Sequence, residues 1–255
     1  MAISSISNQL YNNYQSLASG KRINSAADDA AGLAIAQELQ KQVNGYDAGS
    51  RNVGTSQDML KVADGALSTI SDSLQRMREL SLQASNTAIY SPGDINSIQQ
   101  EIEQLKQSIA GTASQTQFNG KNILDGSMGN SHVATGPGSQ GFDIQMPNAV
   151  LESLGIADYD VTKDFDISTL DAALDKVNSA RSSLGASSNT LDYVLEYNAN
   201  ASYNTTAAQS RIEDLDYPQA VSELKKNQLL QTFQLMMQRR QLENENGRVL
   251  QLYRS

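Results

Sequence analysis

The chain lacks cysteine and tryptophan and has only four phenylalanines among its 255 residues. Without cysteine, neither a disulfide framework nor a thiolate metal site can form. Without tryptophan and with so little phenylalanine, most of the buried apolar area has to come from leucine, isoleucine, valine, alanine and methionine. These side chains suit long helices packed side by side better than a thick globular core.

Basic charge and long apolar runs are also scarce. The formal net charge is −9, whereas a nucleic-acid surface needs clustered cations to neutralise phosphates. The pairs Lys225-Lys226 and Arg239-Arg240 come closest, and both are interpreted as solvated faces of a helix. No run of about 18 apolar residues is present, and the N-terminus lacks the basic start and apolar stretch of a secretory signal. We therefore expect no nucleic-acid partner, no membrane insertion and, if the protein leaves the cell, another export route.

Residue patterns that support catalysis are missing as well. His132 is the single histidine, and it sits in a loop rich in glycine and serine, without an acid or hydroxyl partner at a recognisable motif spacing. The chain has no phosphate-binding loop, no dinucleotide fingerprint and no paired histidines for zinc. The acidic pair Asp28 and Asp29 is interpreted as a helix start. The pair Glu101 and Glu103 is interpreted as a solvated helix face. The sequence predicts no enzyme, no catalytic or metal-binding residue and no cofactor.

A first long helix is predicted over residues 28–86. Asn24 or Ser25 would cap it, and the carboxylates of Asp28 and Asp29 would favour the positive end of the helix dipole. Apolar and small residues along this stretch recur at alternating steps of four and three, which predicts a seam that packs against partner helices. The seam consists of Leu39, Val43, Tyr46, Ser50, Val53, Leu60, Ala63, Leu67, Ile70, Leu74, Met77, Ser81 and Ala84.

A second long helix with the same spacing is predicted over residues 168–216. It ends at Tyr217 because the residue before a proline resists the helical conformation, and Pro218 can open a last helix over residues 218–253. At the other end of the chain, apolar residues at steps of three and four predict a helix over residues 1–17. The two chain ends are expected to pair with each other. The N-terminal stripe consists of Ile3, Ile6, Leu10, Tyr14 and Leu17.

A small non-helical region separates the long helices. The Asn-Gly dipeptide at 119–120 and the Asp-Gly dipeptide at 125–126 supply the positive φ angles of tight hairpin turns. Residues 126–141 are predicted to be a loop, and alternating apolar residues over 142–146 predict a half-buried strand. The predicted fold is mainly α: an elongated antiparallel helical bundle or coiled coil of long helices with a small β-hairpin region.

Four blocks of the sequence resemble those of bacterial flagellins, in the same order and at similar spacing. The longest resembles the N-terminal signature: Ser19-Gly20-Lys21-Arg22-Ile23-Asn24-Ser25-Ala26-Ala27-Asp28-Asp29-Ala30-Ala31-Gly32-Leu33-Ala34-Ile35-Ala36. A helix motif and a hairpin follow as Gln75-Arg76-Met77-Arg78-Glu79-Leu80 with Gln83, and Gln115-Thr116-Gln117-Phe118-Asn119-Gly120-Lys121 with Leu124-Asp125-Gly126. The C-terminal arm is matched by Leu184-Gly185-Ala186 with Asn189 and Leu191, and by Ser210-Arg211-Ile212-Glu213-Asp214-Leu215-Asp216.

The resemblance implies a domain organisation. Residues 1–18 and 217–255 are expected to be the terminal helices of an inner-core coiled-coil domain. Residues 19–126 and 168–216 are expected to form a helical outer-core domain with a β-hairpin, and residues 127–167 a short variable region with a strand. The resemblance also implies a secreted subunit of the bacterial flagellum that is exported by the flagellar type III pathway without a cleaved signal peptide. Such a subunit polymerises into the filament, serves motility, and meets an export chaperone and a cap protein.

The resemblance also implies two groups of partner-contacting residues. The expected self-assembly interface consists of Arg22, Ile23, Asn24, Asp28, Asp29, Arg211, Ile212 and Asp214. The expected contact for an innate immune receptor consists of Arg76, Leu80 and Gln83. For Arg76, an ordinary ion pair with Glu79 is the alternative interpretation.

Two departures from the family pattern carry expectations of their own. Members usually have a longer arm ahead of Ser19, so half of the C-terminal apolar face is expected to lack an intrachain partner. A neighbouring subunit or a chaperone would cover it, or the start codon lies upstream, or the protein assembles poorly. Glu213 stands where the family usually has arginine, which places one salt bridge in doubt. A hook–filament junction protein and a secreted, non-polymerising flagellin-like protein remain alternative functions.

Overall fold

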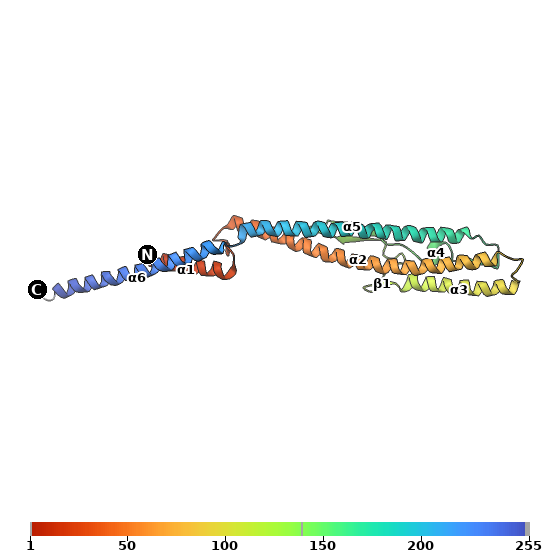
Figure 1. The fold of residues 1–255 in the computed structure, drawn as a ribbon, viewed down its shortest axis with the longest axis horizontal. Helices are drawn as coiled ribbons and strands as arrows, with labels where there is room; N and C mark the ends of the chain where they lie inside the picture. The colour runs from red at the N-terminus through yellow and green to blue at the C-terminus, as the bar shows by residue number, and fades with distance from the viewer. Residues whose placement is uncertain (1, 139, 253–255) are drawn as a thin grey trace. The chain divides into compact units, whose positions relative to one another are not determined.

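The computed structural model describes residues 2–138 and 140–252, and the side chains of residues 7–138 and 140–246. The fold is mainly α, with two short antiparallel strand pairs, as the sequence predicts (Figure 1). By internal packing the chain divides into a larger unit, residues 44–202, and a smaller unit, residues 1–43 with 203–255. The elements are α1 (Ala2–Ser19), α2 (Ala30–Ala84), α3 (Pro92–Gln115), β1 (Gln117–Phe118), β2 (Lys121–Asn122), β3 (Asn130–Ala134), β4 (Gly141–Gln145), α4 (Leu151–Leu154), α5 (Ser168–Glu213) and α6 (Tyr217–Leu252).

In the larger unit, α2 and α5 run antiparallel. Gln57 of α2 donates to Asp192 of α5 at 2.6 Å, and further along α2, Asp64 accepts from Arg181 at 2.8 Å. The seam predicted for this half of α2 is confirmed, because none of its residues from Leu60 onward is more than 2% exposed. In the earlier half of α2 the seam is thinner: Val43 and Val53 are buried, whereas Leu39, Tyr46 and Ser50 are only half-buried.

The two strand pairs agree only in part with the expectation. Asn119 (φ 50°) and Gly120 (φ 74°) form the predicted two-residue turn between β1 and β2, with the positive φ at both positions that this hairpin type requires. Residues 126–141, expected to be a loop, contain β3, which pairs antiparallel with the predicted strand, now β4. The loop prediction was wrong because a strand needs a partner for its backbone groups, and the residues just before the predicted strand supply it.

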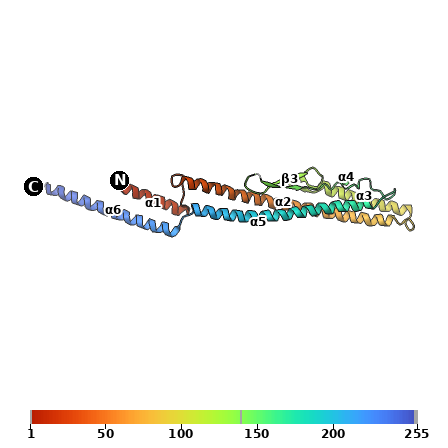
Figure 2. The ribbon, with the colours of Figure 1, turned by 90° about the horizontal axis from the view of Figure 1, so that it is seen from above.

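The terminal helices of the smaller unit pack against each other, as predicted (Figure 2). Gln228 of α6 donates to the Tyr14 hydroxyl at 2.9 Å, and the Tyr217 hydroxyl donates to the Leu17 carbonyl at 3.0 Å. Leu10 is buried in this pair. The side chains of Ile3 and Ile6 from the predicted stripe, and Tyr253 at the predicted end of the last helix, lie outside the described part of the chain.

Candidate functional site

The two linkers of the smaller unit meet at one place, which we term the junction: residues 20–29 and 211–217. The Arg22 amide donates to the Glu213 carbonyl at 2.7 Å, and the Leu215 amide donates to the Gly20 carbonyl at 3.0 Å. Lys21 and Asp214 face each other as an isolated antiparallel bridge. These bonds satisfy backbone groups that the ends of α1 and α5 would otherwise leave unpaired. The connection from α1 to α2 is thereby tied to the connection from α5 to α6.

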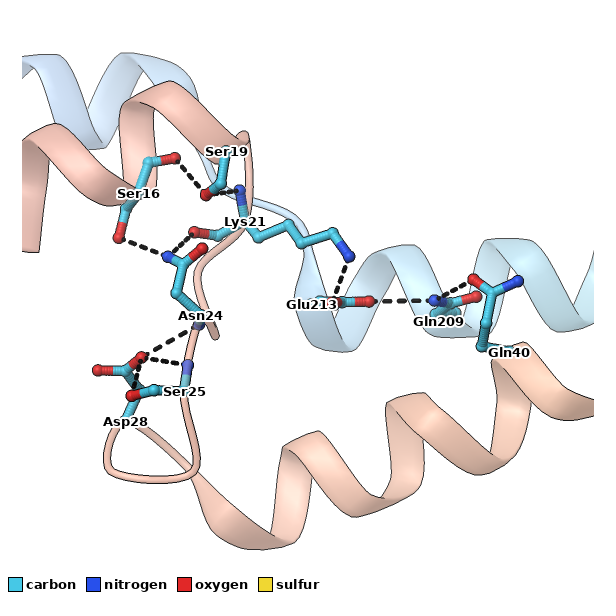
Figure 3. A network of polar contacts seen from close by, with 9 residues as sticks. All are labelled: Ser16, Ser19, Lys21, Asn24, Ser25, Asp28, Gln40, Gln209 and Glu213. Carbon is cyan, nitrogen blue, oxygen red and sulfur yellow. Dashed lines mark hydrogen bonds and ion pairs between the residues drawn. The ribbon is translucent and has the colours of Figure 1, made fainter.

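An ion pair crosses the junction (Figure 3). The Lys21 ammonium lies 2.6 Å from a carboxylate oxygen of Glu213, whose side chain is only 10% exposed. The other oxygen accepts from Gln209 at 3.0 Å, and Gln209 also donates to Gln40 at 3.0 Å. The hydrogen bond from Lys21 holds the pKa of Glu213 below its ordinary value, although burial acts in the opposite direction. Glu213 therefore forms an ion pair of its own with Lys21, a different pair from the one that an arginine at this position would form.

Arg22 and Ile23 occupy the junction in different ways. The exposed Arg22 guanidinium donates to the Ile212 carbonyl at 2.6 Å, close to the C-terminus of α5, where positive charge is favourable. Ile23 is 1% exposed. It packs over Gly32, where a Cβ atom would lie only 2.8 Å from the Ile23 Cδ1. Arg22 thus binds the opposite linker, and Ile23 fixes its own linker against α2.

Asp28 and Asp29, both expected in the first turn of α2, have different roles in the structure. The helix begins at Ala30, not at Asp28, and the Asp29 carboxylate accepts from the Gly32 amide at 2.8 Å as the helix cap. Asp28 closes a separate turn, accepting from the amides of Asn24 at 3.1 Å and Ser25 at 2.9 Å. These hydrogen bonds lower the pKa of Asp28, first through the Asn24 amide and then through Ser25. Asn24 and Ser25 are therefore not the cap, because α2 begins only at Ala30 and Asp29 accepts from its first turn.

The remaining predicted assembly residues line the other side of the junction. Arg211 is exposed and Ile212 is half-buried. Asp214 accepts from the Ser210 hydroxyl, one turn earlier on α5. The Asn24 side chain donates to the Ser16 hydroxyl at 3.2 Å and to the Lys21 carbonyl at 3.0 Å. The structure thus brings the N-terminal and C-terminal members of the predicted assembly group together at the junction, largely through bonds within the chain.

Several residues in the junction and beside it were not predicted from the sequence. Lys21 lies inside the recognised signature, but its partner Glu213 is 192 positions away, and no local spacing predicts such a pair. Gln209 donates to Glu213 and to Gln40, and so extends the hydrogen bonds of the ion pair to α2. For Tyr217, the proline that follows explained the helix end but not the hydroxyl contact with α1. The acidic charge at Glu213, where the family usually has arginine, could have indicated that a basic residue such as Lys21 lies nearby.

The predicted receptor-contact residues lie in the larger unit. Arg76 is paired with both Glu101 at 2.8 Å and Glu79 at 3.2 Å. These carboxylates raise the pKa of Arg76, with the Glu101 hydrogen bond as the largest cause. The ordinary pair with Glu79 is therefore present, and Glu101 is not merely solvated. Gln83 is exposed, whereas Leu80 is 2% exposed and belongs to the core.

His132 has an acid partner across the β3–β4 hairpin, at no recognisable motif spacing. Its Nδ1 lies 2.7 Å from a carboxylate oxygen of Asp143, directly opposite on the β3–β4 hairpin. The contact arises from the pairing of the two strands. It could therefore not be predicted from residue spacing. Both side chains are more than half exposed, which makes the pair an ordinary cross-strand contact.

Neither a metal cluster nor a membrane span is found in the described part of the chain. Over residues 2–138 and 140–252, no group of three or more histidine, cysteine, aspartate or glutamate side chains is arranged to hold a metal ion. No helix in that same part of the chain combines the length and apolar character of a membrane span.

Comparisons with known proteins agree with the architecture. The bacterial flagellin N-terminal helical region matches residues 1–128, and the bacterial flagellin C-terminal helical region matches residues 167–252. The chain is 34% identical over 282 residues to the flagellin of Bacillus subtilis, covering 95% of this chain and 92% of that protein. It is 36% identical over 239 residues to the flagellar filament 33 kDa core protein of Treponema phagedenis, covering 86% and 83% respectively.

A solved structure shows the same likeness. The crystal structure of Bacillus cereus flagellin aligns with a TM-score of 0.51 and 30% sequence identity, covering 58% of this chain and 88% of that chain. Two family regions together match most of the sequence, and full-length relatives are more than 30% identical. The chain therefore belongs to the bacterial flagellin family.

Proposed function

We propose that this chain is a structural subunit of the bacterial flagellar filament, polymerising through α6 and the junction. One observation carries the proposal. Along α6, eight large apolar side chains are between 37% and 61% exposed. Such a concentration of exposed apolar area on one helix marks a binding surface. These residues are Val221, Leu229, Leu230, Phe233, Leu235, Met236, Met237 and Leu242.

Copies of the same chain are the occupant that fits this face. Full burial of one such side chain contributes about 1.5–3 kcal/mol, so a few of them are enough to hold subunits together. The relative from Treponema phagedenis is described as a filament core protein. Because α1 covers part of α6 through Leu10, the exposed residues are those that neighbouring copies would complete.

The junction has a positioning role in this proposal. Ile23, Asn24, Asp29 and Asp214 order their own linkers through local contacts. Lys21 and Arg22 tie the two linkers to each other within one chain. Arg211 and Arg22 are exposed beside them, so both would be accessible to neighbouring subunits. The junction thus fixes the direction in which α1 and α6 leave their linkers, and this direction sets which apolar face a neighbour meets.

The remaining partners follow from family membership. We infer export through the flagellar type III route to the cell exterior, with an export chaperone covering the apolar face of α6 before assembly and a cap protein receiving the subunit. For an innate receptor, Arg76 and Gln83 are the accessible contacts. Leu80 would act only by supporting the helix, since it is buried.

Seeded polymerisation tests the proposal. Purified chain is mixed with filament fragments, then sedimented and viewed by negative-stain microscopy, alongside the variants Phe233→Ala on α6 and Ile89→Ala in the larger unit. Both native residues are exposed. We expect growth with the unmodified chain and with Ile89→Ala, and weakened growth with Phe233→Ala. A chain that stays monomeric under every seeding condition would eliminate the filament function. It would favour a hook–filament junction protein or a secreted, non-polymerising protein.

A further inference from the structure

The loop between β3 and β4 touches both long helices of the larger unit. The Asn52 side chain of α2 donates to the Ala134 carbonyl at 3.1 Å, and the Asn198 side chain of α5 donates to the Thr135 carbonyl at 2.6 Å. Consecutive carbonyls of one strand end are thus held by two antiparallel helices. We propose that residues 134–138 act as a brace that fixes the axial register of α2 against α5.

Two glycines on α2 make room for the brace. A Cβ atom at Gly49 would lie 2.2 Å from the Thr135 carbonyl oxygen, and one at Gly45 would lie 2.5 Å from the Pro137 Cβ. Glycine in a helix interior destabilises the helix relative to alanine. At Gly54 on the same helix a Cβ atom would meet nothing within 4 Å. Gly45 and Gly49, one turn apart, are therefore explained by the close approach of the loop.

Asn198 makes the contact specific. The residue is 2% exposed, which is unusual for an asparagine. A buried amide group that loses its hydrogen-bond partner destabilises the folded state. Movement of the loop away from α5 would leave this donor without the Thr135 carbonyl, so the brace and the helix pair are expected to form together.

A register device is needed at this position because the apolar seam is thin there. Tyr46 and Ser50 are half-buried, and Tyr46 meets Tyr197 edge-on at 6.2 Å between ring centres. A repeating seam of small and apolar residues allows neighbouring registers of similar energy, and a polar contact at one position selects among them. The ion pair between Asp64 and Arg181 is partly exposed, and such pairs contribute little.

Distances between spin labels test the proposal. Because the chain has no cysteine, the labels attach only to the cysteines that are introduced. One label pair, Arg51→Cys with Glu196→Cys, lies on α2 and α5 near the brace. A second pair, Val62→Cys with Ser183→Cys, lies near the contact between Asp64 and Arg181. All four native residues are exposed. Double electron–electron resonance spectroscopy then gives a distance distribution for each label pair in the full chain.

Three substitutions are compared in each labelled background. Gly49→Ala pushes the loop away, Asn198→Ala removes the buried donor, and Gly54→Ala is the matched control with open space. We expect the first two to shift the distance near the brace or to broaden it at least twofold. The second label pair and the Gly54→Ala control should keep the unmodified distribution.

The milder Asn52→Ala, whose native side chain is exposed, keeps the test decisive if either stronger variant loses its helical circular dichroism. It should broaden the same distribution to a smaller extent. An unchanged, narrow distance near the brace in folded Asn52→Ala and Gly49→Ala chains would overturn the proposal, even if those chains melt at a lower temperature. The loop would then cover the helices without setting their register.

Discussion

The second half of α2 and the helix α6 are both long and carry similar apolar side chains, but those of α2 are buried and those of α6 are exposed. In α2 every seam residue from Leu60 to Ala84 is at most 2% exposed, covered by neighbouring helices of the same chain. In α6 large apolar residues such as Leu229 and Phe233 are 61% and 59% exposed. The larger unit therefore completes its core within one chain, whereas the large apolar side chains of α6 stay exposed in the single chain.

Under the proposed function, this difference separates folding from assembly along one polypeptide. Most of the buried core lies in the larger unit, and we propose that the exposed apolar residues of α6 join chains. Substitutions in the two regions should therefore change different observables, and the junction between residues 20–29 and 211–217 should fall between them.

The largest effect is expected in the core of the larger unit. Leu74 is fully buried, so Leu74→Ala should lower the free energy of unfolding by about 2–5 kcal/mol. The matched substitution Leu229→Ala on α6 should change it by no more than about 0.5 kcal/mol. Urea denaturation followed by circular dichroism measures both. Equal losses from the two substitutions would remove the distinction between the regions.

A gain of stability is expected where α2 has open space. At Gly65 a Cβ atom would meet nothing within 4 Å, so Gly65→Ala should raise the free energy of unfolding by about 0.8–1 kcal/mol. Gly126→Ala is the contrasting variant, because its φ of +81° strains any other residue. Thermal melting should move upward for the first and downward for the second. A downward shift for Gly65→Ala would show that this face of α2 is covered after all.

A smaller effect is expected at the junction. The ion pair between Lys21 and Glu213 is partly exposed on the lysine side, so a double-mutant cycle should give a coupling of about 0.2–1 kcal/mol. The exchange Lys21→Glu with Glu213→Lys should recover part of that coupling, since the charges are reversed but still opposite. If the exchanged chain is no more stable than either single variant, the pair contributes through shape and not through charge.

The pH dependence of the junction should be the smallest effect. The pKa of Glu213 is lowered in the folded chain from 4.5, chiefly by the hydrogen bond from Lys21. Its stabilisation is therefore present above about pH 4.5 and is lost as the pH falls through the lowered folded-state value. Glu213→Gln should flatten the part of the stability profile that lies below about pH 4.5. An identical acid profile in that variant would assign the acid sensitivity to other carboxylates, such as Asp28.

The sequence predicted the regular features well because they are local. Alternating steps of four and three along α2 placed Leu67, Ile70 and Leu74 in one seam, and the Asn-Gly dipeptide placed the turn at 119–120. The bonds of the described junction could not be predicted in this way. Lys21 and Glu213 are distant in the sequence, so their pairing depends on the tertiary fold.

The errors have physical causes of the same kind. Asp28 and Asp29 both suit a helix start, and only the position of the Asn24 and Ser25 amides decides which one caps α2. The strand β3 was missed because Asn130 and the neighbouring glycines resemble a loop until β4 lies beside them. The contact between His132 and Asp143 arises from that same pairing.

Hydrogen–deuterium exchange on the free chain and on sedimented filaments tests the central claim most directly. We predict that amides of α2 around Leu67 to Leu80 exchange slowly in both states. Amides of α6 around Leu229 to Leu242 should exchange quickly in the free chain and become protected only in the filament. Slow exchange of α6 in the free chain, or unchanged rapid exchange after sedimentation, would contradict the assignment of this helix to contacts between subunits.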